Sequence, residues 1–593
     1  MINHSKSNIK YSALLSLWGH LSRRRQKQFW ILLLLMIFAS MVEIISIGAV
    51  LPFLGVLTAP EQVYQHHLMQ TFNHLFSIDT PEQLLLPITI VFIGATLFAA
   101  TIRLMLLYIM TRLSFAVGAD LSINIYHRTL HQDYAVHVSR NSSEIINGIT
   151  GKTGAVVNGI MIPVMIIISS SIATSFIIIA IFTIDFVIAL GTLLIFSTLY
   201  LFIVRFTRGK LLNNSKIIAT QSTKVIKSLQ EGLGGIRDVL IDNSQNFYCN
   251  LYRTANNPVL RAAGNNIFLG QSPRFILEAI GIILISVIAY SMSLRGGGLI
   301  EAIPMLGVLA LAAQRLLPAL QQIYASYSTI KGSYASFEDA LILLNQPLTN
   351  YKKHSHSKPI PFKKEIKLNN LNFRYTEDSL WVLKNVNLSL KKGTRIGFMG
   401  PTGGGKSTLI DIIMGLLLAS EGGLIIDNQT INSKNRRAWQ AHISHVPQNI
   451  YLSDSTIEEN IAFGIEKDLI DHQRVKKSVQ LAQIAELIEE WKDGYQTFVG
   501  ERGIRLSGGQ RQRIGIARAL YKQANVLIFD EATSALDNET EQAVMDAIEG
   551  LGEEITILII AHRLTTLKGC DKIVKLDKDY VIHTGSYKEM VNG

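Results

Sequence analysis

Six long apolar stretches in the first 350 residues constrain the fold of this 593-residue chain more than any other feature. A bilayer core of about 30 Å is crossed by roughly 20 apolar helical residues, the approximate length of each stretch. The sequence therefore predicts a membrane domain of six α-helical spans. They are Trp30–Leu54, Leu86–Met110, Gly159–Phe182, Phe186–Val204, Phe275–Ser293 and Ile300–Ile323.

Basic residues gather on one side of the predicted membrane. The net charge of +11 lies mostly before residue 350. The connection Gly55–Leu85 has no Lys or Arg, whereas the N-terminus and the polar stretches Thr111–Asn158 and Arg205–Arg274 are rich in them. The positive-inside rule places these parts in the cytoplasm, with both termini. The basic balance belongs to the membrane topology and does not indicate a nucleic-acid partner.

Composition changes along the chain and divides it into four parts. Overall, 48% of the residues are hydrophobic and 17% charged, which argues against a disordered chain, a fibrous protein or a simple soluble enzyme. We expect a cytoplasmic N-terminal segment at 1–29, the six-helix domain at 30–335, a linker at 336–365 and an α/β domain at 366–593. The two polar stretches have helical composition, so the membrane helices are expected to continue outside the bilayer.

A phosphate-binding loop lies in the α/β domain. Gly400-Pro-Thr-Gly-Gly-Gly-Lys-Ser407 matches G-x-x-x-x-G-K-[ST] between a predicted strand, Arg395–Met399, and a predicted helix, Ser407–Leu417. Backbone N–H groups of such a loop wrap phosphates, Lys406 reaches the β- and γ-phosphates and the Ser407 hydroxyl coordinates Mg²⁺. The predicted phosphate-binding residues are Gly400, Thr402, Gly403, Gly404, Gly405, Lys406, Ser407 and Thr408.

An acidic pair ends a second predicted strand. Val526-Leu-Ile-Phe precedes Asp530 and Glu531. Asp530 at the carboxyl end of a buried strand can hold the Mg²⁺ shell, and Glu531 beside the γ-phosphate can act as the general base toward water. Together with Lys406, the pair predicts nucleotide hydrolysis.

A third motif is Leu506-Ser-Gly-Gly-Gln510, ahead of a predicted helix at Arg511–Tyr521. Taken alone, it fits an anion-binding helix start or an ordinary helix-start turn equally well. In its position, however, it resembles the signature of ABC transporters. The region Ile366–Gly593 resembles an ABC nucleotide-binding domain through motifs in the family's order. They are Tyr375, the phosphate loop, Gln448, the signature, Asp530-Glu531, Ser534-Ala-Leu-Asp537 and His562.

This resemblance implies roles for the matching residues. Glu531, His562 and Gln448 would be catalytic, and Ser407, Gln448 and Asp530 would hold Mg²⁺. Tyr375 would stack on the base of ATP. The signature would close on the nucleotide of the opposite subunit, and Asp537 would lie in the loop that spans the dimer. The implied signature and dimer residues are Ser507, Gly508, Gly509, Gln510 and Asp537.

Six spans followed by one such domain resemble an ABC exporter half-transporter over the whole chain. The resemblance implies a homodimer in a phospholipid bilayer that hydrolyses ATP with Mg²⁺, and a multi-pass protein of the bacterial inner membrane. In that family the segments Asp133–Glu144 and Leu229–Asp238 would contain the two coupling helices. Glycines at 232, 234 and 235 predict a turn in the second segment.

Three arginines within or bordering the predicted spans suggest the cargo. Arg103, Arg274 and Arg315 would be costly in a membrane unless they face a cavity or a partner. One interpretation is a substrate cavity for a phosphate-bearing lipid headgroup, which guanidinium groups bind through paired hydrogen bonds. The alternative is interfacial placement or pairing with a nearby acid, for which Glu43, Glu278 and Glu301 are candidates.

Shorter phrases resemble the lipid-linked oligosaccharide flippases of bacterial protein N-glycosylation. They are Ser139–Ile146, Leu229–Ile236 and Leu316–Tyr324. This resemblance implies a pyrophosphate-linked oligosaccharide lipid as cargo. Alternatives are a lipid A-type lipid, a drug or a peptide. A different class, a non-transport ABC ATPase acting in DNA repair or channel regulation, is disfavoured by the six spans.

Overall fold

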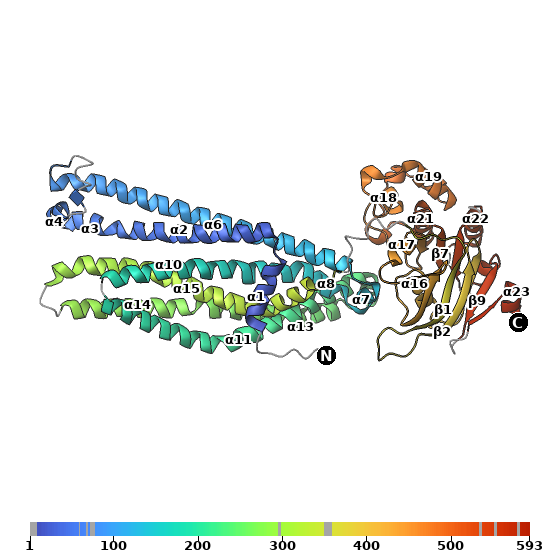
Figure 1. Cartoon of the computed structure of the whole chain (residues 1–593), viewed down its shortest axis with the longest axis horizontal. Helices are drawn as coiled ribbons and strands as arrows, with labels where there is room; N and C mark the ends of the chain where they lie inside the picture. The colour runs from blue at the N-terminus through green and yellow to red at the C-terminus, as the bar shows by residue number, and fades with distance from the viewer. Residues whose placement is uncertain are drawn as a thin grey trace. The chain divides into compact units, whose positions relative to one another are not determined.

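The chain forms two compact units, here described separately. The computed structural model describes residues 9–58, 60–66, 69–70, 78–184, 186–293, 298–348, 359–532, 536–550, 554–561, 563–577 and 582–592. The first unit, residues 1–132 and 140–349, is helical, and the second, residues 133–139 and 350–593, carries the β-sheets (Figure 1).

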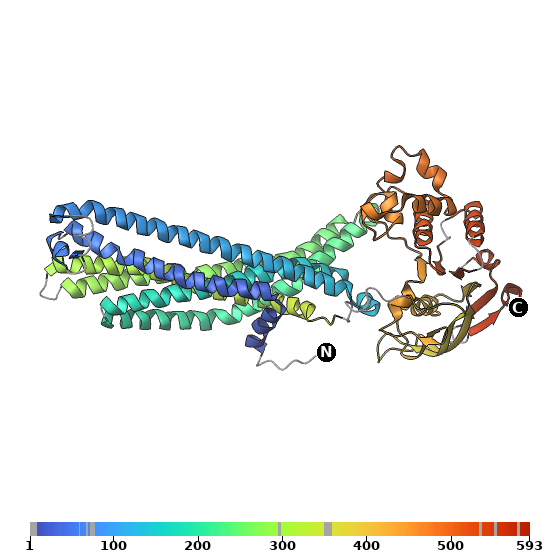
Figure 2. The same ribbon diagram turned by 45° about the horizontal axis from the view of Figure 1, so that its top comes forward.

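Long helices make up the first unit because its apolar stretches continue into polar helical sequence. α6, at 46 residues, is roughly 69 Å long, more than twice the thickness of a bilayer core. The predicted helix extensions are therefore present, and α11 and α13 run side by side in one of them (Figure 2). The larger helices are α1 (Ile9–His20), α2 (Arg23–Gly48), α3 (Val50–Thr58), α6 (Leu85–Leu130), α10 (Ile162–Ile184), α11 (Phe186–Gly234), α13 (Gln245–Gln271), α14 (Pro273–Ser293) and α15 (Gly298–Leu344).

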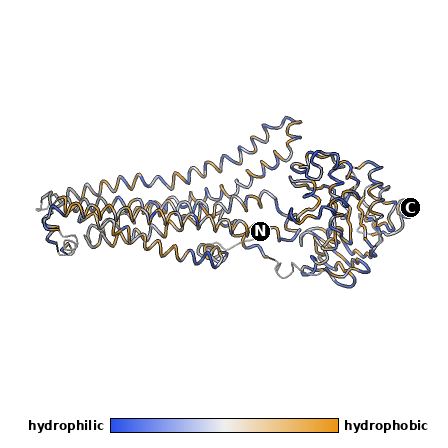
Figure 3. Tube along the Cα trace, turned by 90° about the horizontal axis from the view of Figure 1, so that it is seen from above, coloured by the Kyte–Doolittle hydropathy of each residue, from blue (hydrophilic) through white to orange (hydrophobic). Residues whose placement is uncertain are grey.

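Within the described residues, three helical stretches are long and apolar enough to cross a membrane. They are Arg23–Ser46, Pro81–Leu130 and Ser142–Ile179, and they contain most of the first three predicted spans. The other three predicted spans fall on α11, α14 and α15, whose apolar segments include side chains outside the described set. Figure 3 shows hydrophobic residues along the helices of this unit, with hydrophilic residues recurring in the extensions.

Two π-helical turns interrupt the third membrane helix, η2 (Gly148–Lys152) and η3 (Val157–Met161). They separate α8 (Ser142–Asn147), α9 (Thr153–Val156) and α10. This helix packs closely on its neighbours: a Cβ built on Gly159 would lie 2.3 Å from the Ser333 hydroxyl of α15. Buried Lys152 donates to Asp339 of α15 at 2.7 Å. A close approach at Gly159 and an ion pair between buried Lys152 and the more exposed Asp339 therefore help to set this interface.

The polar stretches contain short helices where coupling helices were expected. α7 (Tyr134–Ser139) lies in the first stretch, and α12 (Ile236–Ile241) lies in the second. α11 continues through Gly232 and Gly234, and the predicted turn falls on Gly235, with φ −100° and ψ 25°. α4 (Pro60–Gln65) and η1 (Pro81–Leu84) lie in the connection after the first span.

Two sheets build the second unit. The antiparallel sheet has the order β2-β1-β4-β5, and the larger sheet has the order β10-β9-β3-β8-β7-β6, parallel except for β10. The strands are β1 (Glu365–Phe373), β2 (Leu383–Lys391), β3 (Arg395–Met399), β4 (Glu421–Ile426), β5 (Gln429–Thr430), β6 (Ile443–Val446), β7 (Val526–Asp530), β8 (Thr556–Ile560), β9 (Lys572–Leu576) and β10 (Ile582–Gly585).

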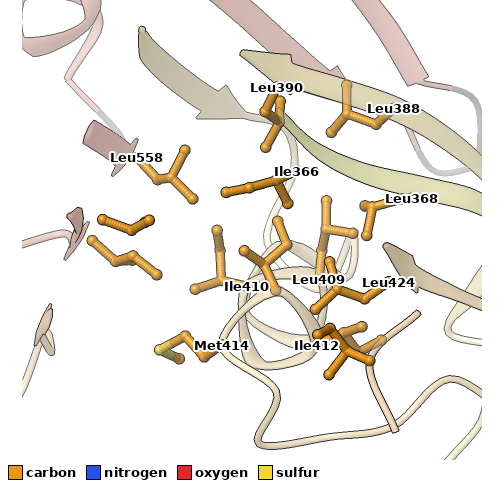
Figure 4. Packing of buried hydrophobic residues seen from close by; sticks show 14 of the residues in the cluster. Ile366, Leu368, Leu388, Leu390, Leu409, Ile410, Ile412, Met414, Leu424 and Leu558 are labelled. Atoms are coloured by element: carbon orange, nitrogen blue, oxygen red, sulfur yellow. The ribbon is translucent and has the colours of Figure 1, made fainter. Parts of the chain in front are cut away.

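One hydrophobic cluster joins the two sheets through α16 (Lys406–Ile413). Ile366 and Leu368 of β1 face Leu409 and Ile410 of α16, with Leu558 of β8 nearby (Figure 4). This packing fixes the helix that follows the phosphate loop. The remaining helices are α17 (Arg436–Gln440), α18 (Ile457–Ile461), α19 (His472–Leu481), α20 (Ala485–Glu490), α21 (Gly508–Tyr521), α22 (Asn538–Glu549) and α23 (Tyr587–Asn592).

Candidate nucleotide site and membrane cavity

The phosphate loop joins β3 to α16, as the sequence predicts. Gly400, Gly403 and Gly405 have positive φ angles of 148°, 81° and 84°. A Cβ at Gly400 would lie 2.3 Å from the Leu576 carbonyl oxygen, so this position requires glycine. The Lys406 ammonium donates to the carbonyl oxygens of Gly400 and Pro401, at 2.9 Å each. The loop thus curls around its lysine at the start of a helix, the geometry that binds phosphate.

Other predicted phosphate residues surround this turn. Gly404 N–H donates to the Pro401 carbonyl at 3.1 Å, which closes the loop around Thr402 and Gly403. Ser407 and Thr408 lie in the first turn of α16. The Thr408 hydroxyl is 3.1 Å from the phenol oxygen of Tyr375. Tyr375 is half exposed and packs edge-on against Phe373, with ring centroids 5.1 Å apart.

The acidic pair lies at the carboxyl end of β7. Glu531 has a left-handed backbone, with φ 51°, and its N–H donates to the Ile560 carbonyl at 3.0 Å. The Gln448 amide nitrogen donates to Glu531 Oε2 at 2.6 Å. These two predicted catalytic residues are 83 positions apart, and only the sheet brings them together. His562, the third, lies outside the described residues.

Charges at this edge of the sheet influence one another. Burial raises the pKa of the Asp530 carboxyl, and the neighbouring Glu531 adds to the shift while Lys406 opposes it. Burial lowers the pKa of Lys406, against the opposing influence of Glu531 and Asp530. The Glu531 charge beside Asp530 makes this strand end a place where a cation is stabilised.

The donors at this position suit Mg²⁺. The Ser407 hydroxyl, the Gln448 amide and the Asp530 carboxylate are hard oxygen ligands, which Mg²⁺ prefers alongside nucleotide phosphates. No group of three or more His, Cys, Asp and Glu side chains forms a metal cluster within the described residues. A mixed set completed by phosphate oxygens and water therefore fits better than an all-protein cage.

The signature forms a helix start. The Ser507 hydroxyl accepts from Gln510 N–H at 3.2 Å, and the Gln510 side chain accepts from Ser507 N–H at 2.8 Å. Because of this capping box, α21 begins at Gly508, three residues before the predicted helix start at Arg511. In the described part of the chain, no hydrogen bond joins Ser507, Gly508, Gly509 or Gln510 to the phosphate loop of the same chain.

Asp537 caps the next helix. Its carboxylate accepts from the N–H and hydroxyl of Thr540, at 2.9 Å each, and these bonds lower its pKa. The cap fixes the first turn of α22, the next helix after β7. Residues 533–535, between the two, lie outside the described set.

Sequence reasoning missed two groups next to the nucleotide site. Burial raises the pKa of the Asp411 carboxyl in α16 to about 6, and the nearby Asp530 adds to this shift. Tyr134 of α7 belongs to the second unit, where burial raises its pKa together with the charges of Asp411 and Tyr375. Asp133 pairs with Arg436 beside it. In the sequence, Asp411 stands alone among apolar residues in the stretch Leu409–Ile413, and this pattern could have indicated it.

A cavity of about 520 Å³, with mostly apolar walls and a few polar side chains, lies within the helical unit. Arg103 lines it and forms an ion pair with Glu43 of α2. Its walls come from α2, α6, α10 and α15. The lining residues are Ala39, Ser40, Glu43, Arg103, Leu106, Leu107, Met110, Ile166, Ser169, Ser170, Ala173, Ile177, Gln314, Pro318, Ala319 and Gln322.

The other two predicted cavity arginines lie elsewhere. Arg274 is about half exposed and pairs with Glu278 of its own helix at 2.6 Å, and neither residue lines this cavity. The Arg315 side chain lies outside the described set. The structure therefore places Arg103, and not Arg274, at the cavity.

Comparison with known families decides what the two units are. The ABC transporter transmembrane region matches residues 29–314, and the ABC transporter family matches residues 383–534. The chain is an ABC exporter half-transporter. A solved structure of a bacterial Atm1-family ABC exporter with ATP bound has a TM-score of 0.78 and 21% identity to the half-transporter, and covers 96% of each chain. This likeness supports the fold.

Curated relatives of the half-transporter differ in their described roles. The ATP-dependent lipid A-core flippase of Francisella tularensis subsp. holarctica is 37% identical over 281 residues, 47% of this chain and 45% of the flippase. The aligned region thus spans about half the length of that relative. The heterocyst differentiation ATP-binding protein HepA of Nostoc is 29% identical over 563 residues, 93% of this chain and 90% of HepA.

Proposed function

We propose that two copies of the half-transporter form a homodimer that couples ATP hydrolysis to the movement of an anionic amphipathic lipid across the bacterial inner membrane. The proposal rests on one juxtaposition. The chain that carries a phosphate loop beside the Gln448–Glu531 contact also has a cavity within its membrane helices that is part polar and part apolar.

Hydrolysis is assigned to the end of β7. Glu531 is the general base toward water, oriented by the Gln448 amide that donates to it at 2.6 Å. Lys406 holds the β- and γ-phosphates. Ser407, Gln448 and Asp530 would hold Mg²⁺, which would offset phosphate charge when bound. Tyr375 stacks on the base, and His562 contacts the γ-phosphate.

The dimer follows from the position of the signature. Ser507 and Gly509 of one subunit close on the nucleotide held by the other subunit's phosphate loop, so each of the two sites is shared. Asp537 lies at the boundary between the subunits. Such a symmetric arrangement makes both sites equivalent.

The cavity suggests a lipid with a phosphate headgroup. Arg103 supplies a guanidinium for phosphate, and Leu106, Leu107 and Met110 supply an apolar wall. The similarity to lipid A-core flippases favours a lipid A-type cargo over the lipid-linked oligosaccharide that the shorter phrases resemble. Both cargoes present phosphate next to lipid chains. The N-terminal segment and the helix extensions lie in the cytoplasm, with both termini.

Reconstitution tests this function. The purified protein is reconstituted into liposomes that contain a fluorescent lipid. This lipid is an analogue of lipid A, of a pyrophosphate-linked oligosaccharide lipid or of neutral phosphatidylcholine. We expect ATP-dependent movement of a phosphate-bearing anionic lipid to exceed movement of the neutral one, and the Glu531→Gln variant to abolish it. The preferred anionic lipid identifies the cargo. ATP hydrolysis without movement of any lipid in the panel would contradict the proposal.

A further inference from the structure

Arg103, the cationic side chain that lines the cavity, already has an acidic partner. Arg103 of α6 and Glu43 of α2 form an ion pair across the cavity wall. The two side chains differ in exposure: 45% of Arg103 is exposed and 12% of Glu43. Both residues line the cavity, and Arg103 is the more exposed member of the pair.

Glu43 and Arg103 are the charged residues in the described cavity lining. The other polar side chains of the described lining are neutral, and some of them have hydrogen-bond partners within the protein. The Ser40 hydroxyl donates to the Met36 carbonyl at 2.9 Å, and Ser170 donates to Gln322 at 2.9 Å. An anion that enters therefore meets Arg103 together with its acidic partner Glu43.

We propose that Glu43 is a specificity-determining residue that competes with an anionic headgroup for Arg103. This inference rests on the proposed lipid transport and names the residue that sets its affinity. A guanidinium binds phosphate well because it donates two parallel hydrogen bonds. In this cavity, however, the phosphate approaches an Arg103 that is paired with Glu43. The carboxylate keeps binding of the phosphate amphiphile weak enough for release and holds Arg103 neutralised while the cavity contains no anion.

Removal of the Glu43 charge therefore has a specific consequence. Arg103 loses the acidic partner beside it, and its attraction for an anion rises, most of all in surroundings of low dielectric constant. Glu43→Gln keeps the size of the side chain and its hydrogen-bonding capacity. We expect about tenfold tighter binding of a phosphate amphiphile, and an unchanged affinity for a neutral amphiphile of the same chain length.

A binding experiment tests this inference without ATP. Full-length protein in phosphatidylcholine nanodiscs is titrated with tritiated dodecyl phosphate and, separately, with tritiated dodecyl glucoside. Glu43→Gln should tighten binding of the phosphate about tenfold, and Arg103→Gln should weaken it at least tenfold. The double variant should behave like Arg103→Gln, because Glu43 acts through Arg103.

Glu278→Gln is the matched control. It removes the same charge from an Arg–Glu pair on a membrane helix outside the cavity, and it should leave dodecyl phosphate affinity within about twofold of wild type. Glu43→Asp, with a shorter carboxylate, provides a second test if Glu43→Gln unfolds, and should tighten binding less. Thermal melting of each variant reports its folding.

Several results would overturn the inference. The first is that Glu43→Gln binds dodecyl phosphate no more tightly than wild type does. The second is that Glu43→Gln tightens binding of dodecyl glucoside as much as binding of dodecyl phosphate. The third is that neither wild type nor Glu43→Gln binds dodecyl phosphate. Competition by inorganic phosphate as strong as by dodecyl phosphate would also overturn it, because the ligand would then be a free anion. Glu43-sensitive binding without lipid movement would support the inference and contradict only the transport function.

Discussion

At the scale of single residues, left-handed backbone conformations shape the nucleotide site. Gly400 approaches the Leu576 carbonyl where no side chain fits, and Glu531 adopts φ 51° at the end of β7. Positive φ is unfavourable for residues with side chains and persists where surrounding bonds impose it. The N–H of Glu531 is held by Ile560, so the carboxylate stands at the strand end beside Gln448.

The phosphate loop yields the first prediction. Gly400→Ala would force its Cβ against the Leu576 carbonyl at φ 148°, and should destabilise the loop by about 2 kcal/mol or more and abolish ATP binding. Gly403→Ala is the control, because its Cβ would have no atom within 4 Å and only φ strain of about 1 kcal/mol remains. Binding of a fluorescent ATP analogue measures both variants. Equal ATP affinities of the two would contradict the close contact.

The proposed general base gives the second prediction. Glu531→Gln keeps the shape that contacts Gln448 and removes the proton acceptor. ATP hydrolysis should fall about 100-fold or more while ATP binding remains. Glu554→Gln, at a carboxylate whose side chain is 91% exposed, is the control and should keep wild-type turnover. Phosphate release and nucleotide binding are measured on the same samples. Wild-type turnover in Glu531→Gln would disprove its role.

At the scale of elements, contact between membrane helices depends on glycine. The π-helical turn η3 places Gly159 against Ser333 of α15. Gly159→Leu should therefore destabilise the helical unit by about 1–3 kcal/mol through overpacking. Gly154→Leu, where a Cβ meets nothing within 4 Å, should have a smaller effect. Thermal unfolding in detergent compares them, and a larger loss for Gly154→Leu would contradict the packing.

The start of β1 gives a prediction for pH dependence. Burial raises the pKa of Asp427, but the N–H groups of Glu365, Lys363 and Lys364 lower it more, so the net shift is downward from 3.8. A lowered pKa in the folded state contributes stability above pH 3.8 that is lost as pH falls through the folded value.

Asp427→Asn tests this contribution. It should lower the free energy of unfolding by about 0.5 kcal/mol at pH 7, a modest amount because water screens a partly exposed carboxylate. The difference from wild type should shrink below about pH 4. Asp378→Asn, at an exposed carboxyl, is the control. Calorimetry at both pH values measures the difference, and an effect that grows in acid would have the wrong sign.

At the scale of the whole molecule, the proposed sharing of ATP sites predicts that the two subunits depend on each other. Lys406→Ala removes the phosphate loop of one chain, and Ser507→Arg removes the signature of the other. Each variant alone should be inactive. A mixed dimer retains one intact site, formed by Lys406 of the Ser507→Arg chain and Ser507 of the Lys406→Ala chain.

Co-expression should therefore restore activity. With random mixing and independent sites, the unseparated dimers should show about a quarter of wild-type ATP hydrolysis, and the purified mixed dimer about half. Separate affinity tags on the two chains isolate the mixed dimer for the assay. Activity of either variant alone, or a purified mixed dimer without any hydrolysis, would contradict shared sites.

Much of this architecture could be predicted from the sequence. Apolar runs of membrane-spanning length predicted the helical unit, since hydrophobicity and helical length are local properties. The strand, glycine-rich loop and helix around Gly400 also follow from local sequence. The helix at the signature began earlier than predicted because Gln510 closes a capping box with Ser507, a local signal that the prediction did not use.

Contacts between distant residues were decided by tertiary structure alone. The sheet order brings Gln448 to Glu531, and helix packing pairs Arg103 with Glu43 while Arg274 pairs within its own helix. The sequence offered Glu43, Glu278 and Glu301 as candidate partners of the membrane arginines, and it did not show which acid pairs with which arginine. The sequence by itself determined which segments are helices, strands and phosphate loop, because local polarity and backbone freedom control them. Which charges meet depends on how the segments pack, and that packing is a property of the whole fold.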